Sequence, residues 1–260
     1  MSSGGPATPA ARDAAYFDRW YADMTTSTAR DAIVARTLGL PPELQSTSLL
    51  TWQGIAEVTA ELRMPPEGLL LDVACGRGGY GIEVARRTGA RLLGVDFSAV
   101  ALRQARSRGA GLLPAGRSAF QVGTLLATGV PTATVDGVMC VDAVQFADPP
   151  LAAMLEFHRV LAPGGRLVLS SWEAADASDD LVSPRLHAVN LRRDLPAAGF
   201  VDVQVHERAD WRAVERVLWE EAVAAPDGSD AAVRSLQAEG RRSLHAFDSL
   251  RRVFATATAP

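Results

Sequence analysis

Between Leu69 and Ser170 the chain alternates short apolar runs with helical segments. Runs such as Leu69–Val73 and Val135–Val141 are apolar at nearly every position, so a strand formed there has two faces that avoid water. Strands of this kind, separated by helices, indicate a parallel sheet covered by helices on both sides. The expected strands are residues 69–73, 91–95, 120–122, 135–141 and 166–170.

The end of the chain has a different pattern. Val201, Val203 and Val205 alternate with polar residues, which is typical of an edge strand with one wet face. A long helical stretch over residues 211–246 follows, and residues 252–258 (RVFATAT) resemble one more strand. A final strand that arrives after an edge strand suggests an antiparallel pair attached to the parallel sheet.

The first strand leads into a glycine-rich loop, residues 74–81 (ACGRGGYG). Gly76, Gly78 and Gly81 follow the pattern G-x-G-x-x-G, which alone indicates only that a ligand lies close to the backbone. Asp72 stands four residues before Gly76, where its carboxylate would repel a pyrophosphate. The loop is therefore expected to face a cationic ligand rather than a dinucleotide.

Asp96 ends the second strand, twenty residues after Gly76. A carboxylate at this place accepts both hydroxyls of an adenosine ribose, in dinucleotide sites and in others. The alternative for Asp96 is an acidic loop residue that binds no ligand, and the alternative for Asp72 is a helix cap. Together, an adenosine site and a ligand with an ammonium or sulfonium end favour S-adenosylmethionine.

Four motifs in series carry a resemblance to a known family. They lie at residues 71–79 (LDVACGRGG), 94–98 (GVDFS), 135–140 (VDGVMC) and 159–167 (RVLAPGGRL). Over roughly residues 67–207 and the last strand, the chain resembles the class I S-adenosylmethionine-dependent methyltransferases. The resemblance implies an α/β, Rossmann-like, seven-stranded methyltransferase sheet in the order 3-2-1-4-5-7-6, with strand seven antiparallel.

The resemblance also implies cofactor contacts. Asp72 and the backbone near the glycine loop would face the methionine end, Asp96 the ribose, and Phe97 the adenine. Thr124 stands where the family usually has an acid that bonds the adenine amino group, and it would make a weaker bond. The full set expected to bind S-adenosylmethionine is Asp72, Ala74, Gly76, Gly78, Asp96, Phe97, Thr124, Leu125 and Val141.

Candidate substrate contacts come from aromatic residues and from strand ends. Trp172 and Gln145 follow the fifth and fourth strands, where an acceptor would lie, whereas aromatic residues elsewhere can also be core anchors. The predicted substrate residues are Trp20, Tyr21, Trp52, Gln145 and Trp172. His187 is the best-placed optional base. Because methyl transfer needs chiefly alignment and exclusion of water, proximity is expected to supply most of the catalysis.

The chain divides into a tail, a cap, a core and a lid. Both helical additions are expected to adjoin the carboxyl edge of the sheet and to enclose a small molecule. The expected parts are a disordered tail at 1–12, a helical N-terminal cap at 13–66, a cofactor-binding core at 67–209, a helical insertion at 210–247 and the final strand of the core at 248–260.

Composition excludes several other functions. The net charge is −4, and the 26 basic residues are all arginines, which removes P-loop, Schiff-base and short-chain-dehydrogenase chemistry. No basic field for nucleic acid and no membrane span are expected. Cys75 and Cys140 are interpreted as free thiols of a cytoplasmic protein without a metal site. Asp148-Pro149-Pro150-Leu151 differs from the Asp-Pro-Pro-Tyr signature of base-methylating enzymes, and Asp148 is interpreted as a helix N-cap.

The sequence therefore predicts a methyltransferase that acts on the O, N or C atom of a small organic molecule, plausibly in secondary metabolism. The alternative is a protein of the same fold that uses the cofactor structurally, to catalyse a cyclisation or to bind a ligand. The oligomeric state stays open.

Overall fold

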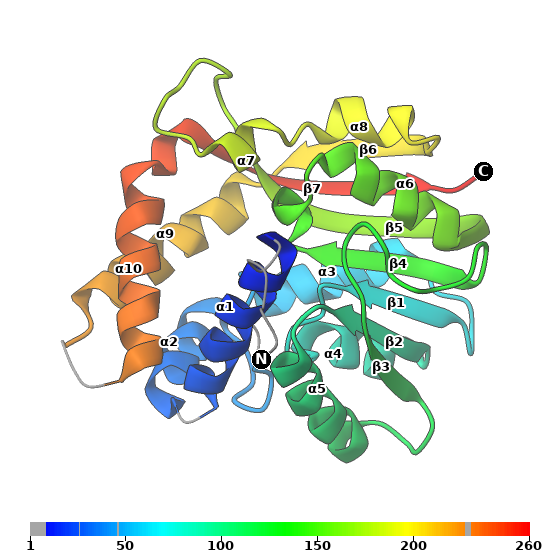
Figure 1. The fold of residues 1–260 in the computed structure, drawn as a ribbon, viewed down its shortest axis with the longest axis horizontal. Helices are drawn as coiled ribbons and strands as arrows, with labels where there is room; N and C mark the ends of the chain where they lie inside the picture. Colours follow the sequence, from blue (N-terminus) through cyan, green and yellow to red (C-terminus); the bar gives the residue numbers. More distant parts are fainter. Residues whose placement is uncertain (1–8, 26, 46, 227–229) are drawn as a thin grey trace, which may run out of the picture.

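The apolar runs form one seven-stranded sheet in the order β3-β2-β1-β4-β5-β7-β6 (Figure 1). The computed structural model describes residues 9–25, 27–45, 47–226 and 230–260. β7 is antiparallel to both of its neighbours, so the expected fold class and strand order are confirmed. The strands are β1 Leu69–Val73, β2 Arg91–Asp96, β3 Ser118–Val122, β4 Val135–Val141, β5 Leu161–Ala174, β6 Val201–Glu207 and β7 Leu250–Thr258.

β5 is longer than the sequence predicts. It pairs with β7 from Arg166 to Ala174, so that the antiparallel partner extends the strand past Ser170. Residues 162–165 lie within the strand at a shift of register against β4, and Gly164 there has φ of +80°. This extension carries Trp172 and Glu173 beyond the end of β4.

Helices cover both faces of the sheet because its side chains alternate between two buried clusters. Leu70 and Met139 pack with α3, α4 and α5, whereas Leu71 and Val138 face α6 and α8. These helices are α3 Trp52–Leu62, α4 Gly79–Thr88, α5 Ala99–Leu112, α6 Pro150–Val160 and α8 Leu191–Ala197. The remaining short elements are η1 Val144–Phe146, α7 Pro184–His187 and η2 Phe247–Ser249.

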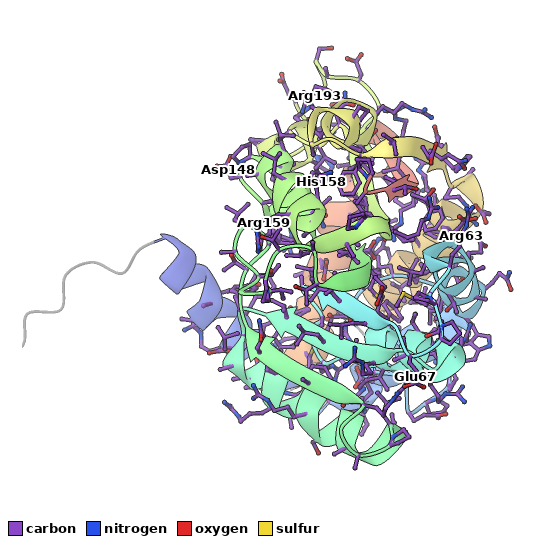
Figure 2. All side chains as sticks on the ribbon, turned by 90° about the vertical axis from the view of Figure 1, so that its right-hand side faces the viewer. Arg63, Glu67, Asp148, His158, Arg159 and Arg193 are labelled. Carbon is purple, nitrogen blue, oxygen red and sulfur yellow. The ribbon has the colours of Figure 1, made fainter. Side chains whose placement is uncertain are left out.

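A cap of four helices lies beside the carboxyl ends of the parallel strands (Figure 1). It consists of α1 Pro9–Met24, α2 Thr28–Leu38, α9 Ala209–Ala224 and α10 Ala231–His245. The two N-terminal helices of the cap contact the two C-terminal ones. Trp20 on α1 donates to Ser235 Oγ on α10 at 3.1 Å, and Arg36 on α2 pairs with Glu221 on α9 at 2.6 Å. Figure 2 shows the opposite end, where Arg63 and Glu67 lie near the start of β1.

Two expected boundaries are corrected. α1 begins at Pro9, so residues 9–12 are helical rather than part of a disordered tail, and residues 1–8 lie outside the described residues. Asp148 is not the N-cap of α6, because the helix starts one residue later with Pro149 at the cap and no side-chain bond. Among the described residues, none of the helices combines the length and the apolar composition that a membrane span requires.

Candidate functional site

The glycine-rich loop between β1 and α4 is held in a backbone conformation that favours glycine. Ala74, Gly76 and Gly78 have φ of +58°, +51° and +77°. A Cβ at Gly76 would come within 2.7 Å of the Tyr21 hydroxyl, and a Cβ at Gly81 within 2.4 Å of Asp72 Oδ2. Side chains at Gly76 and Gly81 would therefore collide with Tyr21 and Asp72.

Asp96 organises the glycine loop from the end of β2. Its carboxylate accepts the Gly76 N–H and the Ser98 N–H, both at 2.8 Å. Burial raises the pKa of Asp96 to about 6, against the bonds from these main-chain donors. Ser98 in turn caps α5, as its hydroxyl accepts from Ala101 N at 3.1 Å. One carboxylate thus fixes the loop at the place where the sequence predicts ribose binding.

Asp72 is the second buried carboxylate beside the loop. Its exposed fraction is 4%, and burial together with the Asp96 carboxylate raises its pKa to about 8, despite a bond from the Gly81 N–H. A cation in contact with Asp72 would offset this cost of ionisation. The local electrostatics therefore favour a positively charged group at the loop, as the sequence predicts.

The raised pKa of Asp72 predicts a dependence of stability on pH. A carboxyl group whose pKa rises from about 4 in the unfolded chain to about 8 binds more protons when folded, so stability falls as the pH rises between these values. We expect the free energy of unfolding in urea to decrease by roughly 2 kcal/mol or more from pH 5 to pH 8. Asp72→Asn should reduce this dependence, with the remainder coming from Asp96 and Glu215, whose pKa values are also raised. Asp136→Asn, on β4 beside the start of β1, should leave it unchanged. Stability of the native chain that rises over this range would contradict the assignment.

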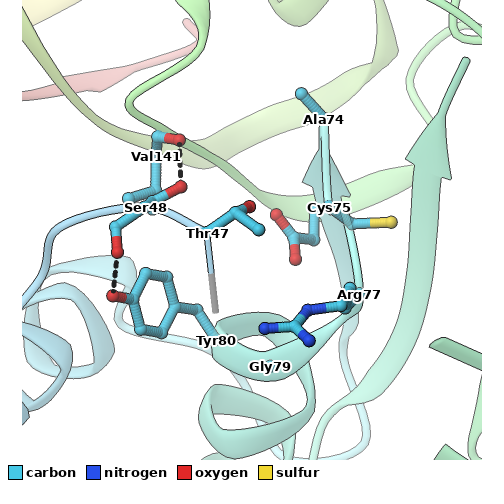
Figure 3. A pocket seen from close by; sticks show the side chains of 9 residues that line it. Thr47, Ser48, Ala74, Cys75, Arg77, Gly79, Tyr80 and Val141 are labelled. Carbon is cyan, nitrogen blue, oxygen red and sulfur yellow. Dashed lines mark hydrogen bonds between the residues drawn. The ribbon is translucent and has the colours of Figure 1, made fainter. Parts of the chain in front are cut away.

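A small cavity lies between the glycine loop and Thr47 and Ser48 (Figure 3). Its volume is about 10 Å³. It includes Val141, which the sequence predicts beneath the methionine end. The residues around it are Thr47, Ser48, Asp72, Ala74, Cys75, Arg77, Gly79, Tyr80 and Val141.

Residues 47–50, here called the strap, cross the cavity between α2 and α3. Ser48 Oγ donates to the Val141 carbonyl at 3.2 Å, and the Tyr80 hydroxyl donates to the Ser48 carbonyl at 2.8 Å (Figure 3). Leu49 N donates to Asp142 Oδ2 at 2.8 Å. The strap is therefore attached to both β4 and α4, and a ligand larger than the present cavity requires it to shift.

Helix α1 covers the ends of β2 and the glycine loop. Asp18 accepts from Ser98 Oγ at 2.6 Å, and Phe17 lies edge-on against Phe97, with ring centroids 5.3 Å apart. Tyr21 is buried beside Asp96 and hydrogen-bonded to Thr47; burial and the Asp96 charge raise its pKa. The structure thus places Tyr21 at the expected cofactor loop rather than at a separate acceptor site.

Thr124 and Leu125 follow β3 near the expected adenine position. The Thr124 hydroxyl accepts from the N–H groups of Leu126 and Ala127 at 3.3 and 3.0 Å, so it closes its own turn and stays exposed. Leu125 is half-buried and packs against the core. Neither lines the cavity.

The predicted acceptor residues are held in separate interactions. Gln145 is buried, with its amide bonded to the Asp142 carbonyl at 2.8 Å and to Ser171 Oγ at 3.2 Å. Trp52 lies under the Arg87 guanidinium, 4.1 Å from its ring centroid, and is not among the residues around the cavity. The structure thus does not bring Gln145, Trp52 and the cavity together.

Trp172 belongs to a buried ionic cluster at the end of β5. Its indole N–H donates to the Glu215 carboxylate at 2.9 Å, and the Arg252 guanidinium lies 4.1 Å from its ring centroid. Arg252 also pairs with Asp142 at 2.5 Å. Burial raises the pKa of Glu215 to about 7, although the Arg252 charge opposes this shift. The cluster joins β4, β5, β7 and the cap helix α9.

His187 ends the short helix α7. One ring nitrogen, Nε2, lies 2.9 Å from the Asp179 carbonyl, and the other, Nδ1, is buried with no hydrogen-bond partner among the described residues. Because a carbonyl oxygen can only accept, Nε2 is the donor in this contact. His158 and His206 lie elsewhere: His158 is on α6, against Phe200 (Figure 2), and His206 is exposed on β6.

Sequence reasoning missed several residues of the cavity: Thr47, Ser48, Arg77 and Tyr80. Signals for three of them were present. Thr47 and Ser48 precede the N-cap Thr51 in a run without helical periodicity. Arg77 is a large, charged residue within a loop of mostly small residues. The contacts that bring them together join residues about 30 to 90 positions apart, which no local pattern encodes.

The residues present fit an adenosyl amino acid. Glycines with positive φ angles let a ligand approach the loop backbone, Asp96 supplies oxygen acceptors, and Asp72 suits a cation. The Nε of Arg77 is a buried donor with no hydrogen-bond partner among the described residues. This set of donors and acceptors matches the chemistry of S-adenosylmethionine.

Comparison with known proteins gives the same family. Residues 70–165 match a family model described as a methyltransferase domain. The chain is 30% identical over 140 residues to the ubiquinone/menaquinone biosynthesis C-methyltransferase UbiE of Geobacter sulfurreducens, covering 53% of this chain and 54% of that one. The chain spans about half the length of the first curated relatives it matches.

Solved structures share the fold over the whole chain. The geranyl diphosphate C-methyltransferase of Streptomyces coelicolor A3(2) superposes with a TM-score of 0.69 at 18% identity, covering 99% of this chain and 100% of that one. The [4+2]-cyclase SpnF superposes with a TM-score of 0.69 at 22% identity, covering 100% and 99%. In its strand order, its ordered motifs and the matched residues 70–165, the chain is similar to the class I S-adenosylmethionine-dependent methyltransferases.

Proposed function

We propose that this protein binds S-adenosylmethionine and transfers its methyl group to a small organic molecule. The observation that carries the proposal is the pair of buried carboxylates, Asp72 and Asp96, on either side of a glycine loop with positive φ angles. One carboxylate suits a cation and the other suits vicinal hydroxyls. The curated relatives are methyltransferases by name, which supports the same activity for this chain.

The chain's own residues would act mainly by alignment. S-adenosylmethionine, when bound, supplies a methyl group on a sulfonium that is already activated for displacement. Asp96 holds the loop through Gly76 and is expected to accept from the ribose hydroxyls, and Asp72 is expected to hold the cationic end. The cap helices exclude water from the carboxyl edge of the sheet, so orientation supplies most of the rate.

The covered site favours a small acceptor. Contacts of α1 with α10 and of α2 with α9 hold the cap together beside the carboxyl edge of the sheet, and a site beneath such a cap suits a small molecule better than a folded protein or a duplex. We propose an acceptor of the kind found in secondary metabolism, with Trp20, Trp52, Gln145 and Trp172 as residues to test for contact. The free thiols Cys75 and Cys140 support a reducing, cytoplasmic location.

The direct test is a screen of metabolite extracts with S-adenosylmethionine labelled in its methyl group. The proposal expects label in an organic product of low molecular mass. Binding of the cofactor without transfer to any acceptor would instead favour the alternative, a protein that uses the cofactor structurally. The whole-length similarity in fold to SpnF keeps that alternative in the test.

Substitution of His187 separates proximity from base catalysis. His187 Nε2 is bonded to the Asp179 carbonyl, and the residue does not line the cavity. His187→Ala is therefore expected to lose less than about tenfold in kcat, roughly 1.4 kcal/mol. Single-turnover methyl transfer measures the effect, and His206→Ala on the exposed strand β6 is the matched control. A loss of about a thousandfold with unchanged cofactor affinity would make His187 the base.

A further inference from the structure

Arg77 is a charged residue inside the glycine loop, and its side chain is almost completely enclosed. The residue is 2% exposed, and its guanidinium is turned from the loop towards Tyr80 (Figure 3). Its two terminal nitrogens bind both oxygens of Asp31 on α2, at 3.0 and 2.7 Å. The third donor, Nε, is buried with no hydrogen-bond partner among the described residues.

Arg77 shares its carboxylate with a second buried arginine. Asp31 also accepts from Arg30, whose Nη1 lies 2.9 Å away. Burial and the Arg77 charge lower the pKa of Arg30. Asp31 therefore balances the Arg77 charge only in part. A buried guanidinium with a spare donor and a shared counter-ion is a site that an anion can complete.

The cavity that Arg77 lines presents two opposite charges. Asp72 lies on its wall, and so does Arg77, with the hydroxyl residues Thr47 and Ser48 on the strap. A zwitterion has a cationic and an anionic group to place against this pair. A neutral or purely cationic ligand would leave the Arg77 Nε without a partner, which costs about 1–3 kcal/mol.

We propose that Arg77 recognises the carboxylate of the cofactor's amino-acid end, with Nε as donor, and that Asp31 holds the guanidinium in place for this contact. The inference rests on the proposed function and assigns Arg77 as the residue that selects ligands with a free carboxylate. Asp31 is a positioning residue, because it engages the two outer nitrogens and leaves the inner one for the ligand.

The test compares two ligands that differ in the amino-acid end. S-adenosylhomocysteine carries the carboxylate, and 5′-methylthioadenosine lacks the amino-acid end. Calorimetry on Arg77→Met is expected to show S-adenosylhomocysteine binding weakened by about 10- to 100-fold, with the affinity for 5′-methylthioadenosine changed by less than about threefold. Asp31 keeps its pairing with Arg30 in this variant, so the fold should persist.

Two further variants make the result specific. Arg86→Met removes an arginine on α4, the helix that follows the loop, and its side chain is 57% exposed. This control should change the affinity for neither S-adenosylhomocysteine nor 5′-methylthioadenosine. Arg77→Lys keeps the charge without the forked donors, and its affinity for S-adenosylhomocysteine should fall by an intermediate amount. This variant provides the test if Arg77→Met does not fold.

The outcomes are distinct. Equal losses for both ligands would show that Arg77 only shapes the loop, and unchanged affinity for S-adenosylhomocysteine would show that another group takes the carboxylate; either result overturns the inference while the proposed function stands. A wild-type protein that binds neither ligand would contradict the proposed function and this inference with it.

Discussion

Replacing Asp96 by alanine is expected to weaken the binding of S-adenosylhomocysteine by about 100-fold or more. The substitution removes charge-assisted acceptors for the ribose, each worth about 1.5–3 kcal/mol. It also leaves the Gly76 and Ser98 N–H groups without the carboxylate that now holds them at 2.8 Å. Calorimetric titration of the folded variant measures the loss.

The matched control for this prediction is Asp136→Ala. Asp136 also uses its carboxylate to hold a main-chain donor, since it accepts from Leu69 N at 2.8 Å, but it does so at the start of β1. The control should lose stability without a change in affinity. Wild-type affinity in Asp96→Ala would show that this residue is an ordinary loop acid.

Replacing Arg252 by methionine is expected to destabilise the fold by about 3–5 kcal/mol, because it leaves buried carboxylates without their cation. Arg252 is completely buried between Asp142 and Glu215, at 2.5 and 3.8 Å. For a chain of this size the loss corresponds to a fall in Tm of roughly 10 °C. Thermal unfolding followed by circular dichroism measures it.

The neighbouring arginine gives a control for position. Arg251 is 43% exposed on its side chain and pairs with Glu173 at 3.0 Å. Glu173 also accepts from Leu191 N at 2.8 Å, so Arg251→Met should cost clearly less than Arg252→Met. Removing the opposing charge as well, in Arg252→Met with Asp142→Asn, should recover part of the stability. If Arg252→Met unfolds at the wild-type temperature, the cluster does not secure the cap to the sheet.

The sheet was predictable because its signals are local. Strands that are apolar on both faces, the alternation at Val201 to Val205 and the glycine loop each determine their own conformation, and Asp72 and Asp96 follow directly from strand ends. The position of a residue at the carboxyl end of a parallel strand also fixes the edge of the sheet on which it lies. The residue pattern therefore predicted the strands and placed Asp72 and Asp96 at strand ends, and the family resemblance implied the strand order that the structure confirms.

The acceptor side was less predictable because long-range contacts decide it. Trp172 was expected just after β5 but lies within the longer strand, and its indole N–H donates to Glu215 from α9. Gln145 follows β4 as expected, yet its amide donates to the Asp142 carbonyl and accepts from Ser171 Oγ. Tyr21 reaches the glycine loop only because α1 packs across α5, a contact with no periodic signal in the sequence.

The central claim is that the glycine loop holds an adenosyl amino acid and not a dinucleotide. A comparison of the affinities for one ligand of each kind tests this claim most directly. Calorimetric titration of the full chain with S-adenosylhomocysteine and, separately, with NAD compares the two. The account predicts binding of S-adenosylhomocysteine in the micromolar range and no comparable binding of NAD. Tighter binding of NAD would contradict the assignment of Asp72 and the family function built on it.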